Sequence, residues 1–558
     1  MNKIWWKEAV IYQIYPRSFM DSNGDGIGDL VGIIEKLDYI KYLGVDAIWL
    51  SPINRSPNCD NGYDISDYRE IMHAFGTMGD FDRLLKEIHK RGLKILIDLV
   101  VNHTSDEHRW FREARKTRDN PYRDYYYFRK GKGGSNKTPN NWKSWFGGSA
   151  WEYDSLTEEY YLHLFSKNQP DLNWDNKKVR NEIYDIMKFW LNKGIDGFRM
   201  DAIDFISKVK GLPESKNIND EHTGKEFYLN ETKIHKYLNE MNREVLSRYN
   251  IMTAGEVLGV DPEEARKYIE SDREELNMLL TWEHMHVDYG KKGTWDIKNW
   301  SLVDLKKILT KWQGTLDKKG WNSQYLSNHD QPRQVSRFGN DKKYRIESAK
   351  MLATMIHTLK GTPFIYQGEE IGMTNYVFND INEYDDIFAV SMYKESIRRG
   401  EDKERLMKVI NYRSRDNART PMQWNNSSNA GFSRGTPWLK VNPNYGSINV
   451  EESIKDKNSI FNYYRKLIEL RKKNNILIYG KYEIILENNE NIYAYLRSSG
   501  NEKLLIILNF SEDSHLFELP GNIRFAHNEL LISNYDIDCD KINELFLKPY
   551  EARVYRLR

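Results

Sequence analysis

Several features that would assign a protein to a particular class are scarce or missing in these 558 residues. Only two cysteines are present, Cys59 and Cys539, too far apart to form a zinc motif, so we expect neither a disulfide framework nor a structural zinc site. No apolar run reaches the roughly 18 residues that a membrane-spanning helix needs, and the first residues, MNKIWWKEAV, lack the apolar core of a secretory signal. We therefore expect a cytoplasmic protein without a membrane partner.

Charge of one sign is not in excess either. The chain carries 83 lysine and arginine residues against 82 aspartate and glutamate residues, and the basic residues form no stripe or cluster. Proteins that bind nucleic acids or membrane surfaces concentrate positive charge in that way, so we expect neither partner. The sequence does not give the oligomeric state, for which a monomer is the default expectation.

Eight short apolar runs alternate with amphipathic stretches along the chain. The runs are VIYQIY (10–15), AIWLS (47–51), KILIDLVV (94–101), GFRMD (197–201), IMTAGE (251–256), LLTWEH (279–284), QYLSNHD (324–330) and PFIYQGEE (363–370). Stretches between them, such as 81–92 and 178–194, have helical spacing and end in the glycine expected just past a helix. This alternation predicts a parallel α/β protein, and eight strands close a (β/α)8 TIM barrel. An open doubly wound sheet is the competing fold, but no GxGxxG follows the first run.

Two intervals are too long for a simple strand–helix unit, and the end of the chain changes in character. Residues 104–173 are rich in Trp, Tyr, Gly and Asn and predict a subdomain inserted after the third strand, whereas a second excursion, 374–455, follows the eighth. From residue 479, alternating strands separated by Asn/Gly turns predict an antiparallel β-sandwich. The expected domains are a barrel in two parts (1–103 and 174–478), the insert (104–173) and a C-terminal β domain (479–558).

Polar and charged side chains follow four of the predicted strands, at the end of a TIM barrel where active sites lie. These residues are Asp98, Asn102, His103, Arg199, Asp201, Glu256, Asn328, His329 and Asp330. Each residue alone could be a helix cap or a turn former. Capping and turn formation do not explain well why such residues occur at four strand ends. Converging carboxylates suit acid–base and nucleophilic chemistry. A zinc role for the two histidines lacks a third ligand at a fitting spacing.

The loop DSNGDGIGDL (21–30) is similar to part of a calcium-binding loop. Asp21, Asn23 and Asp25 alternate and are followed by a glycine, as in the first half of an EF-hand. The position of the bidentate glutamate is Gly32, however, and a strand-like run precedes the loop where an EF-hand has a helix. The residues argue against a calcium sensor, and they leave open both a metal site of oxygen ligands and a polar turn without metal.

Eight ordered segments carry a resemblance to a known family. They are YQIYPRSFMDSNGDGIGDL (12–30), DNGYDISDY (60–68), VVNH (100–103), QPDLN (169–173), GFRMDAI (197–203), GEV (255–257), LSNHDQPR (326–333) and SRDNARTPMQW (414–424). Four of them, VVNH, GFRMDAI, GEV and LSNHDQPR, are similar to the signature regions of the α-amylase superfamily of glycoside hydrolases. QPDLN is similar to a further motif of the oligo-1,6-glucosidase and α-glucosidase branch, and the resemblance extends over nearly the whole chain.

The resemblance implies a retaining mechanism with two carboxylates. Asp201 would be the nucleophile, and Glu256 the general acid and then the base, which requires a raised pKa. Asp330 would bond the sugar hydroxyls more strongly as the ring distorts toward the transition state. Arg199, on the same strand face as Asp201, would keep that carboxylate ionised.

The resemblance also implies an exo-acting pocket for a small oligosaccharide. Asp60 and Arg415 would hold the far edge of the terminal glucose and close the site, and Tyr63 would stack beneath that ring. Phe165 and Gln169 would line the entrance. Core packing alone is the alternative for Tyr63 and Phe165. The other residues implied to bind the sugar are His103 and His329.

Ala202, directly after the implied nucleophile, departs from the pattern of oligo-1,6-glucosidases. Relatives that prefer α-1,6 bonds usually carry valine there, whereas alanine or threonine occurs in α-1,4-preferring ones. VLGV (257–260) also differs from the Met-Pro-Gly of oligo-1,6-glucosidases. A difference of about one methyl group in a pocket wall changes the discrimination between two substrates by only about 1–3 kcal/mol. We therefore expect an exo-acting α-glucosidase that releases glucose from the non-reducing end of short maltose- or isomaltose-type substrates, with both linkages open.

Three related activities are alternatives. Sucrose isomerases carry an Arg-Asp-rich stretch after the third carboxylate, where this chain has RQVSRFGND (333–341). Trehalose-6-phosphate hydrolases need cationic groups for the phosphate, which the sequence does not place. The heavy subunits of amino-acid transporters keep the fold as a non-catalytic module, but they carry a membrane helix and have lost catalytic carboxylates.

The resemblance finally assigns a metal to the loop 21–30. In this branch the corresponding loop binds calcium, with magnesium as an alternative. The ion would be a structural cofactor that the chemistry does not require. Its implied ligands are Asp21, Asn23, Asp25, Asp29 and the carbonyl oxygen of Ile27.

Overall fold

A parallel barrel forms the centre of the molecule. The computed structural model describes residues 3–133, 137–270, 272–317, 319–537 and 542–558. Eight parallel strands lie in the order β11-β10-β9-β5-β2-β1-β15-β14, and a parallel bridge between Leu279 and Asn322 joins the two edges. The predicted barrel is therefore confirmed. Its strands are β1 (Ile11–Ile14), β2 (Ala47–Leu50), β5 (Lys94–Val100), β9 (Gly197–Asp201), β10 (Met252–Val257), β11 (Met278–Thr281), β14 (Ser323–Gln324) and β15 (Thr362–Tyr366).

Each of the eight apolar runs overlaps one of these strands, but β11, β14 and β15 end well before their runs do. β14 covers only Ser323–Gln324, and the residues after β11 and β15 turn into the 3-10 helices Glu283–His286 and Glu369–Ile371. The longest barrel strand is β5, in which every residue after Lys94 is buried. A continuous apolar run of this kind is typical of a parallel strand covered on both faces.

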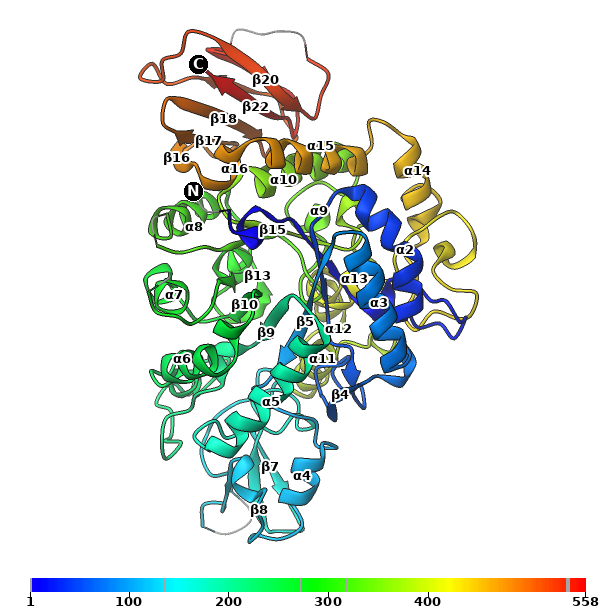
Figure 1. Cartoon of the computed structure of the whole chain (residues 1–558), viewed down its shortest axis with the longest axis vertical. Helices are drawn as coiled ribbons and strands as arrows, with labels where there is room; N and C mark the ends of the chain where they lie inside the picture. Colours follow the sequence, from blue (N-terminus) through cyan, green and yellow to red (C-terminus); the bar gives the residue numbers. More distant parts are fainter. Residues whose placement is uncertain (1–2, 134–136, 271, 318, 538–541) are drawn as a thin grey trace.

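Eight helices surround the barrel, one after each strand (Figure 1). Their ends follow the local chemistry: the Asp29 carboxylate caps the first helix by accepting from the Gly32 N–H at 2.7 Å. Gly194 ends another in the left-handed conformation, at φ 107°, as its position predicts. The helices are α2 (Leu30–Leu43), α3 (Met78–Lys90), α5 (Lys177–Lys193), α6 (Ile234–Glu244), α7 (Pro262–Ile269), α8 (Leu302–Thr315), α10 (Arg345–Thr358) and α15 (Ile460–Lys473).

The segment after β5 forms a small subdomain at the end of the molecule opposite the C-terminal domain (Figure 1). It contains α4 (Arg109–Ala114) and a three-stranded antiparallel sheet of β6 (Phe128–Arg129), β8 (Glu159–Leu162) and β7 (Trp151–Asp154). A buried ion pair of 2.6 Å joins Asp171 in this segment to Lys208, which follows β9. The ammonium of Lys208 also donates to the Asn102 side chain at 2.8 Å, so this contact fixes the subdomain against the barrel.

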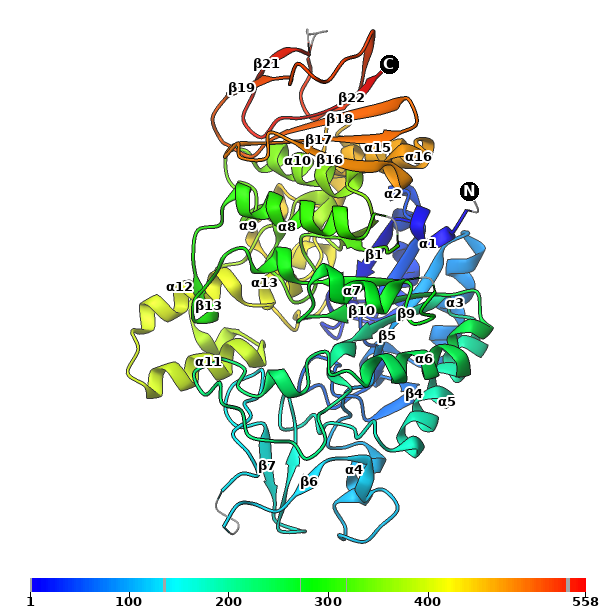
Figure 2. The same cartoon turned by 90° about the vertical axis from the view of Figure 1, so that its left-hand side faces the viewer.

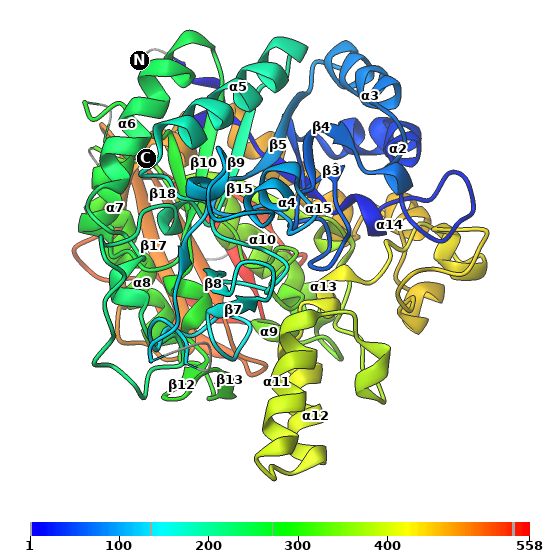
Figure 3. The same cartoon turned by 90° about the horizontal axis from the view of Figure 1, so that it is seen from below.

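A short β-hairpin and a pair of helices pack against each other outside the barrel. The hairpin of β12 (Tyr289–Gly290) and β13 (Gly293–Ile297) contacts α12 (Lys403–Arg413). Figures 2 and 3 show α11 (Ile387–Arg398) and α12 side by side, projecting from the body of the molecule. The remaining elements before the C-terminal domain are α1 (Trp5–Glu8), β3 (Asn54–Arg55), β4 (Asp67–Ile71), α9 (Gln334–Arg337), α13 (Asp416–Arg419), α14 (Val450–Lys455) and α16 (Asn475–Tyr479).

The C-terminal domain is antiparallel, as predicted. Its larger sheet has the order β16-β17-β18-β22-β20, and β19 pairs with β21 in a second sheet. Apolar side chains such as Leu505 and Phe517 lie in a core that both sheets share. The strands are β16 (Lys481–Ile485), β17 (Ile492–Ser499), β18 (Glu502–Asn509), β19 (His515–Glu518), β20 (Asn528–Ser533), β21 (Glu544–Leu547) and β22 (Ala552–Leu557).

Two buried cations attach this domain to the barrel by bonding backbone carbonyls. Arg497 of β17 donates to the Thr358 carbonyl at the end of α10 and to the Gly480 carbonyl at 2.8 Å. Burial lowers the pKa of Lys306 to about 8 and that of Arg497 to about 10. Lys306 of α8 donates to the three carbonyl oxygens of Leu486, Asn489 and Ile492, around the β16–β17 turn.

The composition predicts neither a membrane helix nor a disulfide framework. No helix in the described part of the chain has the length and the apolar character needed to cross a membrane. Cys59 is an exposed free thiol, and Cys539 lies outside the described residues.

Candidate active site

The strand ends open into a cavity of about 610 Å³. The register of β9 and β10 pairs Met200 with Gly255, so Asp201 at the end of β9 lies beside Glu256. The residues that the sequence predicts and that line this cavity are Asp60, Tyr63, His103, Phe165, Gln169, Asp201, Ala202, Glu256, Asp330 and Arg415. Two further predicted residues, Arg199 and His329, are buried behind its wall.

A single guanidinium holds three of the carboxylates. Nη1 of Arg199 lies 2.6 Å from Oδ1 of Asp201 and 2.7 Å from Oδ1 of Asp98. Its Nη2 lies 2.7 Å from Oε2 of Glu256. The same Glu256 oxygen accepts the backbone N–H of Ala202 at 3.1 Å. Asp201 and Glu256 are therefore held close to each other by their common contact with the Arg199 guanidinium.

Burial sets the proton affinity of this group. It raises the pKa of Glu256 to about 7, although Arg199 acts in the opposite direction. A carboxyl group with such a pKa can stay protonated near neutrality, as a general acid must. Burial also raises the pKa of Asp201 to about 7. Arg199 lowers this pKa, as the sequence predicts, but burial outweighs it, and the nearby Asp98 carboxylate raises the pKa further.

Asp330, from the loop after β14, has the opposite electrostatic environment. Burial alone would raise its pKa, but contacts with His329, Arg415 and Arg419 hold the pKa well below its usual value. The Arg419 guanidinium lies 2.8 Å from Oδ1 of Asp330, and that of Arg415 lies 3.5 Å from it. Asp330 is therefore an ionised hydrogen-bond acceptor in the cavity wall.

An ion pair closes one end of the cavity. Arg415 lies 3.2 Å from Oδ1 of Asp60 and is itself held by Asp386 at 2.8 Å. Gln169 donates to the other Asp60 oxygen at 3.1 Å and contacts Nε2 of His103 at 3.1 Å. Gln169 thus contacts the Asp60 side of the cavity wall, and its place at the entrance stays a prediction. Its motif lies beside the residues that follow β5, where a β-bridge joins Asp171 to His103.

His329 supports the cavity from behind. Its ring stacks on Tyr63 at 5.2 Å between centroids, with only 6° between the planes. Nε2 contacts the Tyr63 hydroxyl at 2.5 Å, and Nδ1 contacts the Gln13 amide at 2.8 Å. Both ring nitrogens therefore face protein groups, and the side chain is fully buried. In this arrangement His329 orients Tyr63, and only Tyr63 reaches the cavity.

Ala202 adopts an unusual backbone conformation, with φ 39° and ψ 44°. This left-handed region is uncommon for residues other than glycine and is strained for β-branched side chains. The conformation points the Ala202 N–H at Glu256 and places the residue on the cavity wall. The size of side chain 202 is thus coupled to the geometry of both carboxylates.

Several residues in and behind the wall have contacts that the sequence does not predict. Asp98 lies near the end of β5 and can be picked out for that reason, but its contact with Arg199 cannot. Asp204 is fully buried and accepts the N–H groups of Leu258 and Gly259 at 2.9 and 3.3 Å, which joins the loop after Asp201 to the loop after Glu256. Further aromatic residues of the wall come from four separate segments of the chain: Trp145, Phe146, Trp282, Tyr289, Trp295 and Phe388.

The predicted metal loop is closed by its own hydrogen bonds. Oδ1 of Asp21 accepts the Gly24 N–H at 2.7 Å, and Asp29 caps helix α2. Asp21 and Asp29 are buried, and no lysine or arginine among the described residues forms an ion pair with them. In the same part of the chain, no three His, Cys, Asp or Glu side chains converge as a metal site. The oxygen donors of the loop therefore suit a hard cation, but the carboxylates among the described residues do not converge on one point.

Comparisons with known proteins agree along the whole chain. Residues 13–480 match the model of the α-amylase catalytic domain, and residues 492–554 match that of the C-terminal domain of α-amylase SusG. The chain is 61% identical over 562 residues to an oligo-1,6-glucosidase of Parageobacillus thermoglucosidasius, with 100% of both chains covered.

Two solved structures are similar in fold and less similar in sequence. A trehalose-6-phosphate hydrolase of Bacillus licheniformis, in complex with PNG, has 48% identity and a TM-score of 0.96. An isomaltulose synthase of Erwinia rhapontici NX5, in complex with sucrose, has 48% identity and a TM-score of 0.97. The alignments cover 100% of this chain and 100% of each of those chains.

Proposed function

The chain belongs to the α-amylase family and is a glycoside hydrolase, and we propose that it is an exo-acting α-glucosidase that releases glucose from the non-reducing end of short α-glucosides. One observation carries this proposal: Arg199 holds Asp201 and Glu256 together in a cavity that the Asp60–Arg415 pair closes. The substrate class follows the names of the relatives, since several oligo-1,6-glucosidases are 51–61% identical over nearly the full chain.

The mechanism is a double displacement. Asp201 attacks the anomeric carbon, and Glu256 donates its proton to the glycosidic oxygen as that bond breaks. The products of this step are a covalent glucosyl–Asp201 ester and the released aglycone. Glu256 then takes a proton from water, which attacks the same carbon and frees Asp201. The raised pKa of Glu256 suits the first step, and the short contacts of Arg199 with both carboxylates suit the close spacing of retaining enzymes, about 5–5.5 Å.

Exo action follows from the closed end of the cavity. Asp60, Arg415 and Gln169 form a continuous set of contacts there, so a sugar chain cannot continue past this wall. These groups present charged and amide atoms to the far edge of a terminal glucose. Asp330 and His103 lie on the same wall and would bond its hydroxyls.

The linkage preference rests on two opposing indications. The names of the most similar relatives favour α-1,6 bonds, whereas Ala202 is the residue of the α-1,4-preferring pattern. We propose that both maltose- and isomaltose-type bonds are cleaved. Sucrose isomerisation and trehalose 6-phosphate hydrolysis are the related activities to be tested against this proposal, because the two solved structures with those names are 48% identical.

We further propose a structural calcium ion at the loop 21–30. The observation in its favour is that Asp21 and Asp29 are buried without a cationic partner among the described residues, so that only hydrogen bonds from N–H and O–H groups compensate their charge. Asn23, Asp25 and the Ile27 carbonyl would complete the ligands. The ion would neutralise the loop and stabilise it, and no chemical step needs it.

A reducing, cytoplasmic location and a monomeric state are part of the proposal. Two cysteines in 558 residues suit a reducing compartment. The substrate is a small oligosaccharide, and the nearly neutral charge gives no reason to expect nucleic acid as a partner.

The test is kinetic. Asp201→Asn and Glu256→Gln should each reduce turnover of p-nitrophenyl α-glucoside by a factor of about 10² or more, because each removes an essential group. Near-normal turnover in both folded variants would overturn the site. Initial rates of the unmodified enzyme on maltose, isomaltose, sucrose and trehalose 6-phosphate then decide the substrate: the proposal requires the first two to exceed the others.

A further inference from the structure

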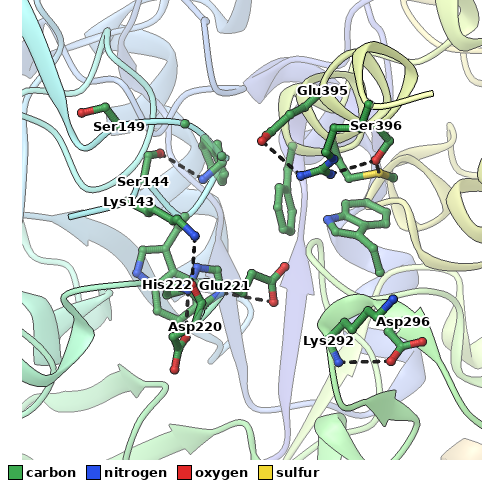
Figure 4. A pocket seen from close by; sticks show the side chains of 18 of the residues that line it. Lys143, Ser144, Ser149, Asp220, Glu221, His222, Lys292, Asp296, Glu395 and Ser396 are labelled. Atoms are coloured by element: carbon green, nitrogen blue, oxygen red, sulfur yellow. Dashed lines mark hydrogen bonds and ion pairs between the residues drawn. The ribbon is translucent and has the colours of Figure 1, made fainter. Parts of the chain in front are cut away.

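Asp204 is a buried carboxylate for which the mechanism has no direct use. It lines neither the catalytic cavity nor the adjoining cavity of about 920 Å³ that Figure 4 shows. Its side chain is fully buried, and no lysine or arginine of the described residues forms an ion pair with it. Substrate therefore does not reach Asp204, and any part that it plays in catalysis must act through other residues.

The burial of this carboxylate is costly. It raises the pKa of Asp204 to about 7, and the nearby Glu256 carboxylate raises the pKa further. Oδ1 has no hydrogen-bond partner in the described part of the chain, so the other oxygen makes the contacts of the side chain. Buried carboxylates without a cation are expensive, and strongly perturbed ones gather at functional sites. Asp204 is therefore a candidate for a functional role.

The turn that carries Asp204 packs against the strand that carries the general acid. It consists of Ala202 and the 3-10 helix Ile203–Phe205. The Ala202 N–H donates to Oε2 of Glu256 at 3.1 Å. The next side chain, Ile203, packs over Gly255, where a Cβ would lie 3.1 Å from Cγ2 of Ile203. The turn thus contacts both the side chain of Glu256 and the backbone directly before it.

Asp204 makes the corresponding contact after Glu256. Strand β10 ends at Val257, and the Asp204 carboxylate accepts the next two N–H groups, those of Leu258 at 2.9 Å and Gly259 at 3.3 Å. Gly259 is held a second time, because the Asn230 amide donates to its carbonyl at 2.8 Å. The Asn230 N–H in turn donates to the Asp204 carbonyl at 3.1 Å. The backbone is therefore tied to one turn on both sides of Glu256.

The same contacts stabilise a strained conformation. Ala202 has φ 39° and ψ 44°, and backbone of this kind persists only where the surrounding structure over-determines it. Two residues later, Asp204 bonds the turn to the opposite loop. Without these bonds Ala202 would be free to relax, and its N–H would no longer be held against Glu256.

From these contacts we propose that Asp204 is a positioning residue for the general acid. It holds the turn after Asp201 and the loop after Glu256 relative to each other, so that Glu256 points its proton at the glycosidic oxygen. Asp204 itself transfers no proton and contacts no substrate. This inference rests on the proposed function, because Glu256 must be the acid of the first step.

The test compares leaving groups that differ in their need for a proton. A sugar alkoxide leaves only when it is protonated, whereas p-nitrophenolate is a stable anion that leaves with little help. Because kcat/KM reports the steps up to the departure of the aglycone, it separates the acid role of Glu256 from its later role as base. The substrates are maltose, isomaltose and p-nitrophenyl α-glucoside.

Three variants make the comparison specific. Asp204→Ala removes the acceptor and should lose about 10²-fold on the two disaccharides, but less than about tenfold on p-nitrophenyl α-glucoside. Asp204→Asn keeps an acceptor oxygen in nearly the same shape and should restore the disaccharides to within about threefold of the unmodified enzyme. Asp261→Ala is the matched control. It also removes an acceptor after β10, where Asp261 caps α7 by accepting the Glu264 N–H at 2.9 Å, and it should change none of the three values.

Each outcome decides a separate point. An equal loss on all three substrates, no loss in Asp204→Ala, or an asparagine variant as impaired as the alanine variant would overturn the positioning role. If circular dichroism shows that Asp204→Ala is unfolded, Asp204→Ser takes its place, because the serine hydroxyl ends one atom short of the carboxylate oxygens.

A separate control distinguishes this inference from the proposed function. Glu256→Gln should show the same dependence of kcat/KM on the leaving group, because it removes the proton itself. If it does not, the assignment of Glu256 as the acid is refuted, and the role of Asp204 with it. An unmodified enzyme that hydrolyses none of the three substrates would refute the α-glucosidase proposal.

Discussion

Replacing Arg199 by glutamine should shift the pH dependence of the enzyme upward. Among the described residues, Arg199 is the one cation that bonds Asp98, Asp201 and Glu256 together, at 2.6–2.7 Å, and it is almost fully buried. An adjacent cation lowers a carboxyl pKa by about 1–3. The pKa of Asp201, already raised to about 7 by burial, should therefore rise to about 8 or higher without Arg199. At pH 7 only about a tenth of the nucleophile, or less, would then be ionised.

The sign of the effect follows from the role of each group. Asp201 attacks only as the carboxylate, so activity is lost as the pH falls through its pKa. The acidic limb of the kcat/KM profile should move up by about 1 or more, and the basic limb, set by the proton on Glu256, should move in the same direction. Because the two groups interact, the profile reports the pair and not each residue separately.

The assay is kcat/KM for p-nitrophenyl α-glucoside from pH 5 to 10, with circular dichroism to verify folding. Arg199→Lys is the control that keeps the charge, but one ammonium cannot make all of these contacts, so its profile should lie between the other two. A folded Arg199→Gln enzyme whose acidic limb does not move, or moves to lower pH, would refute the electrostatic account.

Three further changes have defined outcomes. Ala202→Val should raise the isomaltose-to-maltose ratio of kcat/KM about tenfold, because the wall narrows where the strained backbone meets Glu256; an unchanged ratio would show that residue 202 does not select the linkage. Arg497→Met leaves buried carbonyls such as those of Thr358 and Gly480 without their donor, and each unsatisfied carbonyl costs about 1–3 kcal/mol of stability. Calorimetry should therefore show a lower melting temperature, while kcat stays unchanged. An unaltered melting temperature would contradict this role. Chelation should lower the melting temperature, reversibly on adding calcium, without changing kcat of the folded enzyme. Immediate loss of turnover without unfolding would argue against a purely structural ion.

The barrel could be predicted because its signals are local. Apolar runs of parallel strands such as β5 and glycines such as Gly194 act within a few residues, and each has a direct physical cause. The strand-end carboxylates could be predicted for the same reason, since a barrel places every strand end on one face.

The finer arrangement of the site could not be predicted in this way. His329 and Tyr63 are 266 positions apart, and no pattern indicates that one covers the other. The pKa of Asp201 depends on the balance between burial and one cation, and burial exists only in the folded chain. The strands end early where side chains such as Glu369 turn inward to bond Ser327 and Tyr464, which are also distant contacts.

The carbonyl contacts of Lys306 and Arg497 have a consequence for synthesis of the chain. The acceptors of Lys306 are synthesised about 180 positions after it, and Arg497 is synthesised 139 positions after the Thr358 carbonyl at the end of α10. At about 5–20 residues per second, a ribosome needs roughly 10–40 s to deliver the former. Until then α8 presents the Lys306 ammonium, and α10 the Thr358 carbonyl, without its partner. The barrel should therefore reach its final stability only when the chain is almost complete, and nascent chains that stop before β17 would be targets for chaperones or proteases.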